Sequence, residues 1–169
     1  LLWKMLFYPQ GLLNQLVAIL GFGTRDWLNQ NSAFYVLVFT YIWKNTGYDM
    51  MLWLAGLDGI PLELYEAARV DGAGSRQIFY YVTLPCLKST AFLVTVLSII
   101  NSFKVFDLVN IMTDGGPGRS SNVLVYRIYQ EAFQNYKFGY ASAYAVVLFV
   151  LVFIVTMIQF QGQKKWVNY

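Results

Sequence analysis

The sequence lacks the residues on which most enzyme sites depend. Its 169 residues include no histidine and a single cysteine, Cys86. Without histidine, the chain has neither the commonest general base nor the commonest transition-metal ligand. One cysteine can form neither an internal disulfide nor a zinc cluster. We therefore expect no catalytic residues, no metal and no cofactor, and we expect Cys86 to be an inert packing residue.

Charge is also scarce. Charged residues make up 12% of the chain and hydrophobic residues 57%, whereas ordinary globular chains are about 25% charged. The net charge of +3 comes from scattered residues and not from the clustered basic face that nucleic-acid binding needs. The composition indicates a membrane protein that binds no nucleic acid. Because the chain opens on leucine in mid-pattern, we also expect it to be a fragment of a longer polypeptide.

One segment has the properties of a membrane-spanning helix along its whole length. Residues 138–163, FGYASAYAVVLFVLVFIVTMIQFQGQ, carry no charge and are followed by Lys164 and Lys165. Twenty-odd residues at about 1.5 Å each match a hydrocarbon core of about 30 Å. We predict a transmembrane helix over 138–163 and a short tail over 164–169.

Two further predicted spans contain polar interruptions. Residues 32–57 include a polar patch at 44–49, and residues 89–112 include Lys104 and Asp107. These two charges are three residues apart, so they can neutralise each other on one face of a continuous helix. We predict one transmembrane helix over each range, with its polar middle facing protein or water. Within the patch, Asp49 could pair with Lys44 or with a helix outside this chain.

The remaining segments connect the spans. We predict a loop and an interfacial helix over 1–31, and a loop with a short helix over 113–137, which begins with the turn formers TDGGPGRSSN. No Lys-Ser or Lys-Thr follows the glycines, so this loop is not a nucleotide-binding P-loop. Five lysines and arginines flank the spans on each side, and the positive-inside rule therefore gives no orientation.

The segment 58–88 reads DGIPLELYEAARVDGAGSRQIFYYVTLPCLK. Pro61 suits the start of a helix, where its missing N–H costs nothing, and acidic residues follow in the first turns. The glycines at 71–74 end that helix and turn the chain. Ser75 can then cap a second helix. The pattern predicts a helix-turn-helix lying across the membrane surface. From these residues alone, an ordinary loop joining two spans stays an open alternative.

This segment resembles the cytoplasmic signature loop of permease subunits in bacterial ATP-binding-cassette importers. The similarity lies in Glu-Ala-Ala at 66–68, in Gly72 and in Leu-Pro at 84–85. Val82 stands where isoleucine is usual, and Ser89 where many members have a second proline. The stretches WKNTGYDMMLWLAGLDGIPLELYEAARVDGAG, SFKVFDLVNIMTDGGPGRSSNVLVYRIYQEAF and FGYASAYAVVLFVLVF extend the resemblance to the carbohydrate-importing, maltose-type permeases, in particular the first of their two permease subunits.

The resemblance implies an all-α, polytopic membrane protein of the bacterial plasma (inner) membrane. Three transmembrane helices and a cytoplasmic coupling helix would form the C-terminal portion of a six-helix permease bundle, with 58–88 cytoplasmic and 113–137 external. The implied partners are a second permease subunit, two cytoplasmic ATPase subunits that hydrolyse the ATP, an extracytoplasmic sugar-binding protein that contacts the external turn, and membrane lipid. The alternative function is a polytopic channel or a membrane-embedded enzyme without ATPase coupling.

The resemblance also implies two groups of site residues. Those expected to couple the chain to an ATPase subunit are Glu66, Ala67, Ala68, Asp71, Gly72, Leu84 and Pro85. Those expected to line the sugar path are Asn45, Tyr48, Ser98, Asn101, Ser102 and Val105.

The residues themselves support such a path in part. Sugar hydroxyls need hydrogen-bond partners, and polar side chains inside a span are costly unless they face a cavity or a partner. The path residues of the 89–112 segment are spaced three or four apart, which puts them on one helical stripe. The same polar groups could instead hydrogen-bond one helix to another.

Overall fold

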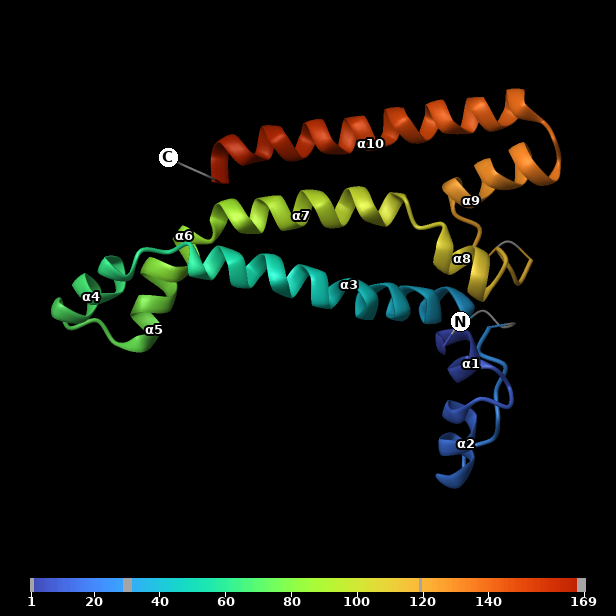
Figure 1. Cartoon of the computed structure of the whole chain (residues 1–169), viewed down its shortest axis with the longest axis horizontal. Coiled ribbons are helices and arrows are strands. Elements are labelled where there is room, and N and C mark those ends of the chain that lie inside the picture. The colour runs from blue at the N-terminus through green and yellow to red at the C-terminus, as the bar shows by residue number, and fades with distance from the viewer. Residues whose placement is uncertain (1, 29–31, 119, 167–169) are drawn as a thin grey trace. The chain divides into compact units, whose positions relative to one another are not determined.

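The computed structural model describes residues 2–28, 32–118 and 120–166. The regular structure in these residues is helical throughout (Figure 1), which confirms the predicted all-α class. The chain forms two compact units, one of residues 1–44 with 102–152 and one of residues 45–101 with 153–169. We refer to these as unit 1 and unit 2. Each of the three longest helices begins in one unit and ends in the other.

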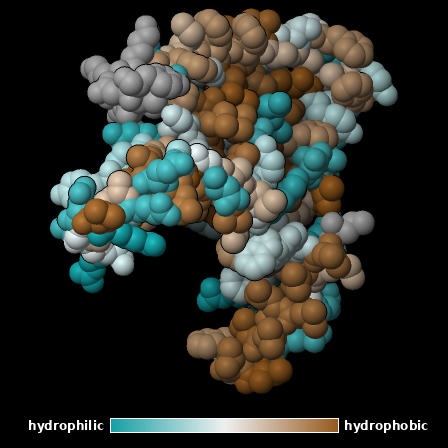
Figure 2. Space-filling model, turned by 60° about the vertical axis from the view of Figure 1, so that its left-hand side comes forward, coloured by the Kyte–Doolittle hydropathy of each residue, from teal (hydrophilic) through white to brown (hydrophobic). Residues whose placement is uncertain are grey.

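Helix α10, Phe138–Trp166, is the helix predicted from the charge-free run. The tail predicted over 164–169 is wrong for residues 164–166, which continue the helix, and residues 167–169 lie outside the described residues. Residues Phe138–Gln163 of α10 are the one stretch of the described chain that forms a single straight helix long and apolar enough to cross a membrane. Most of its side chains are exposed, including Val146, Phe149 and Phe153. Hydrophobic side chains also cover much of the face seen in Figure 2. Apolar surface on this scale needs lipid or protein to cover it.

Helix α3, Ala33–Asp58, runs without a break through the polar patch at 44–49. A helix of 26 residues is long enough for a bilayer, but its polar middle lowers its mean hydropathy. The helix expected over 32–57 is therefore present, and its passage through a membrane stays a prediction.

The single helix predicted over 89–112 is wrong. Helix α7, Lys88–Phe103, ends before residues 104–106, and α8, Asp107–Met112, begins after them. Continuity was expected from pairing of Lys104 with Asp107, but both side chains are exposed and the structure records no ion pair between them. The break instead lets Phe106 pack its ring at 5.0 Å from that of Tyr129.

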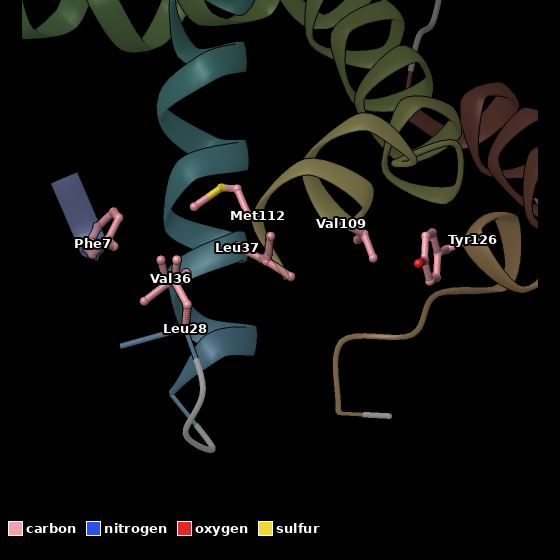
Figure 3. Close-up of a cluster of buried hydrophobic side chains, with 7 residues drawn as sticks. All are labelled: Phe7, Leu28, Val36, Leu37, Val109, Met112 and Tyr126. Carbon is pink, nitrogen blue, oxygen red and sulfur yellow. The ribbon is translucent and has the colours of Figure 1, made fainter. Parts of the chain in front are cut away.

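Unit 1 has a hydrophobic core that joins residues far apart in the sequence (Figure 3). It draws on α1 (Leu2–Phe7), the start of α3, α8, and α9 (Leu124–Tyr129). Unit 1 also includes α2, Leu12–Ile19, and the π-helix η2, Gln130–Gln134. The buried members of the core are Phe7, Leu28, Val36, Leu37, Val109, Met112 and Tyr126.

A buried asparagine fixes the chain before α3. The Nδ2 of Asn14 donates to the carbonyl of Arg25 at 2.7 Å, and its Oδ1 accepts from the indole N–H of Trp27 at 3.0 Å. One side chain thereby holds the loop that follows α2. Of the interfacial helix and loop predicted over 1–31, residues 2–28 form two short helices and a loop tied to them, and residues 1 and 29–31 lie outside the described residues.

Unit 2 holds the end of α3, a series of short helices, most of α7 and the end of α10. The short helices are α4 (Leu62–Val70), α5 (Ser75–Ile78), the π-helix η1 (Phe79–Thr83) and α6 (Leu84–Cys86). The path from α5 to α6 meets α7 at an angle of 58°. Cys86 is exposed, so the expectation that it packs inside the protein is wrong: it lies in the short α6 segment, where the chain bends towards α7.

Candidate functional site

The turn after α4 has a well-defined hydrogen-bond pattern. Gly72 has a φ of +76°, a conformation that side chains on Cβ disfavour. The N–H of Ala73 donates to the carbonyl of Ala68 at 2.9 Å, and the N–H of Gly72 donates to that of Arg69 at 3.0 Å. These two bonds define a Schellman motif, in which a left-handed residue ends the helix. The glycine turn predicted from the sequence therefore has a specific backbone cause.

The second helix of the hairpin begins one residue earlier than expected. Gly74, and not Ser75, occupies the N-cap of α5, with an extended backbone. Its own N–H donates to Oε1 of Gln77 at 2.8 Å, which is the return half of a capping box. Because this side chain satisfies the cap from inside the helix, Ser75 is free to take the first helical position.

Helix α4 has two distinct faces. The hydroxyls of Tyr65 and Thr83 lie 3.2 Å apart, so Tyr65 and the half-buried Ala68, three residues later, face η1. The opposite face carries exposed side chains at the i, i+3, i+4, i+7 spacing of one helical stripe. We call this the docking stripe, and it consists of Glu63, Glu66, Ala67 and Val70.

The docking stripe contains some of the predicted coupling residues. Glu66 and Ala67 belong to it, while Ala68 lies on the packed face and supplies the carbonyl that closes the Schellman motif. Sequence reasoning missed Val70, whose side chain is 88% exposed, although the helical spacing from Glu63 could have found it. The other predicted coupling residues, Asp71, Gly72, Leu84 and Pro85, are all exposed.

Two contacts show that α3 and α7 lie side by side within unit 2. A Cβ on Gly56 would stand 2.5 Å from Oγ1 of Thr90, so the two helices approach closely there. Farther along, the Ser98 hydroxyl donates to Oδ1 of Asp49 at 3.5 Å. From the first contact to the second, the residue number falls in α3 and rises in α7, so the two helices run antiparallel. One further turn in the same register puts Asn45 level with Asn101.

The structure thus brings together some of the predicted path residues. Ser98 lies level with Asp49, Asn45 and Asn101 lie one turn farther along the α3–α7 pair, and Tyr48 is exposed on the same stretch of α3. Ser102 is in the last turn of α7. Val105 is not on the predicted stripe, because it falls in the break at 104–106 and packs against the core of unit 1.

Asp49 is the residue that sequence reasoning left undecided. Its recorded partner is Ser98, and no ion pair with Lys44 is recorded. Five residues on a helix turn the chain by about 140° beyond one full revolution, so Lys44 points away from the side of α3 that carries Asp49. The spacing of four residues from Asn45 was the signal that could have placed Asp49 on the same face.

The segment 113–137 is internally bonded. The buried hydroxyl of Tyr126 donates to Oδ1 of Asp114 at 2.5 Å. Burial, together with the Asp114 carboxylate, raises the pKa of Tyr126 to about 12. Ser121 donates to the carbonyl of Gly116 at 2.6 Å. The segment predicted as a loop with a short helix contains α9 and η2 and belongs to unit 1. We call it the folded cap.

In its described residues the chain is all-helical, with a Glu-Ala-Ala hairpin between two helices that carry polar groups. Residues 2–165 match the family described as binding-protein-dependent transport system inner membrane component. The chain belongs to this family.

Several relatives are similar along nearly the whole chain. The probable ABC transporter permease protein YurN of Bacillus subtilis (strain 168) is 39% identical over 97% of this chain and 58% of its own length. The sn-glycerol-3-phosphate transport system permease protein UgpA of Escherichia coli (strain UTI89 / UPEC) is 33% identical over 99% and 58%. The sulfoquinovosyl glycerol transport system permease protein SmoG of Agrobacterium fabrum (strain C58 / ATCC 33970) is 40% identical over 89% and 49%.

A solved structure has the same fold. It is a bacterial ABC transporter involved in the import of the acidic polysaccharide alginate, with a TM-score of 0.87 and 24% identity. The match covers 99% of this chain and 59% of that one. The chain therefore spans between 49% and 59% of the length of these relatives.

Proposed function

We propose that the chain is part of a membrane-spanning permease subunit of an ATP-driven carbohydrate importer. It would cross the inner membrane several times, with α3, α7 and α10 as spans, the α4–α5 hairpin in the cytoplasm and residues 113–137 outside. Family membership and the transport relatives support this function. The single observation that carries the proposal is the docking stripe, because a loop that only joins two spans does not require a capped helix with an unpartnered face.

The docking stripe would bind a cleft on a separate ATPase subunit. Glu66 supplies charge and hydrogen-bond acceptors, and Ala67 lets the partner approach closely. The opposite face of α4 is held to η1 through Tyr65 and Thr83, and the Schellman motif fixes the turn. A rigid hairpin of this kind transmits a displacement of the ATPase subunits to α3 and α7, which tips the bundle between its inward- and outward-facing states.

The proposed assembly has a second permease subunit, two cytoplasmic ATPase subunits that hydrolyse ATP, and an extracytoplasmic sugar-binding protein. One support is a solved alginate ABC transporter in complex with a periplasmic protein bound to an alginate pentasaccharide; this structure has a TM-score of 0.85 to the chain. The binding protein would contact the folded cap at 113–137. The cargo class follows the relatives, whose names refer to sugar or glycerol derivatives.

The coupling role is tested by reversing charge on the docking stripe. In the complete transporter in proteoliposomes, Glu66→Lys should lower the solute transported per ATP hydrolysed by about tenfold or more, since a central charged contact dominates such an interface. The matched control is Asp58→Lys, which makes the same change at an exposed acid at the end of α3, off the stripe. Coupling that is unchanged in Glu66→Lys, or equally reduced in Asp58→Lys, would refute the role of the stripe.

A further inference from the structure

We propose that Asp49 makes the path between α3 and α7 selective for carbohydrates that carry no negative charge. The inference rests on the proposed transport function and names the cargo class at the same site. It starts from a carboxylate in the middle of a predicted span. An ionisable group at such a depth is costly unless it has a partner or a function.

The partner that the structure gives Asp49 is weak. Its recorded polar contact within the described residues is the Ser98 hydroxyl, at 3.5 Å, which is the long limit for such a bond. A hydroxyl donates one hydrogen, whereas an ionised carboxylate accepts several. Asp49 is half-buried, so part of its acceptor capacity faces outward from the helix pair. Sugar hydroxyls are donors of the kind that this carboxylate can accept.

Among the residues that the structure describes, no ion pair to this charge is recorded. The ion pair recorded in the described part of the chain joins Arg127 and Glu131, which belong to unit 1. Lys44 points to another side of α3. The groups that the antiparallel register places one turn farther along the pair, next to Asp49 and Ser98, are the amides of Asn45 and Asn101, which are neutral. The described site therefore has a net negative charge, which attracts hydroxyl or amino groups and repels carboxylates, phosphates and sulfonates.

This charge distinguishes the chain from what its relatives' names suggest. UgpA is named for glycerol-3-phosphate, and the solved transporter imports an acidic polysaccharide. Both of these cargoes are anions, which a carboxylate lining the path would disfavour. The cargo of this chain would therefore share their polyhydroxylated character but not their charge.

Three ring-matched probes test the inference: D-glucose, D-glucosamine and D-glucuronate. Binding of each would be measured by saturation-transfer NMR on the complete transporter in lipid nanodiscs, without the binding protein, so that only the membrane path selects. The wild type should bind glucose and glucosamine about tenfold more tightly than glucuronate, because two like charges a few ångströms apart interact by several RT. Asp49→Asn, which keeps the shape and an acceptor for Ser98, should remove most of this difference. Asp58→Asn is the matched control and should keep it.

Three outcomes would overturn the inference. They are equal binding of all three probes to the wild type, a preference unchanged in Asp49→Asn, and an equal loss of preference in Asp58→Asn. The second outcome would assign Asp49 to helix packing and the third to general surface charge. Each leaves the coupling measured with Glu66→Lys intact, whereas failure of the Glu66→Lys test would count against the transport function itself.

Discussion

The segments 58–88 and 113–137 both connect long helices through glycine-rich turns, yet they are built in opposite ways. In 113–137, polar side chains are buried and bonded to one another: Tyr126 is 1% exposed and Glu131 is 5% exposed. In α4, the charged residues and Val70 are exposed, and no residue of the helix is buried. Two loops with similar turn residues thus differ in structure, because one buries polar side chains that bond to one another and the other leaves one face of a helix exposed.

The contrast predicts where substitutions reduce stability most. Tyr126→Ala should lower the free energy of unfolding by about 3–5 kcal/mol, because it empties a filled position in the core of unit 1. Tyr126→Phe keeps the ring and should cost about 1 kcal/mol, the value of the hydrogen bond to Asp114. Thermal unfolding of the purified complex in detergent gives both values. If Tyr126→Ala and Tyr126→Phe lower the free energy of unfolding equally, the core of unit 1 does not stabilise the cap.

Tyr126 should also make the stability of the cap depend on pH. The pKa of Tyr126 is raised from 10.0 to about 12, so the unfolded chain loses this proton at a lower pH than the folded chain. The stabilisation is complete below pH 10 and should be lost as the pH rises from about 10 to about 12. Tyr126→Phe is the control, since it cannot ionise and should lack this part of the decline.

A smaller effect is expected at the turn of the hairpin. Gly72→Ala should destabilise it by about 1–2 kcal/mol, because a Cβ is strained at a left-handed φ even though nothing lies within 4 Å of the added carbon. Gly74→Ala is the matched control, since Gly74 has a φ of −73°, and it should cost less than about 1 kcal/mol. Limited proteolysis of the hairpin in the intact complex compares the two. Equal protection of both variants would show that the Schellman motif does not hold the turn.

The sequence predicted the features that depend on neighbours along the chain. The charge-free run marked the start of α10 and most of its length, and Asp71-Gly72 marked the turn, because helix length and backbone conformation are local properties. The helix over 89–112 failed for the same reason: its continuity was judged from two charges on one helix, whereas the packing of Phe106 against Tyr129 was decided by residues more than twenty positions away.

Sites that depend on pairs of helices were predicted only in part. The stripe of Ser98 and Asn101 follows from spacing, but the contact between Ser98 and Asp49 joins positions 49 residues apart, and no local pattern indicates it. The orientation of Ala68 was likewise not indicated by a local pattern. Its place in the Glu-Ala-Ala motif suggests a role beside Ala67, whereas the packing of Tyr65 on Thr83 turns Ala68 towards the protein.

The smallest effect on stability should fall on Val70 of the docking stripe, whose side chain is 88% exposed. Val70→Asp removes no buried contact, so the free energy of unfolding should change by less than about 0.5 kcal/mol. Its effect on coupling should be large, because an added charge would be buried unpaired against the ATPase subunit. Transport per ATP hydrolysed should fall in Val70→Asp and stay near the wild-type value in Arg76→Asp, an exposed change on α5. If Val70→Asp lowers the stability but leaves coupling unchanged, the two segments have the opposite roles. The hairpin would then be packed within the protein, and the cap would be the surface open to a partner.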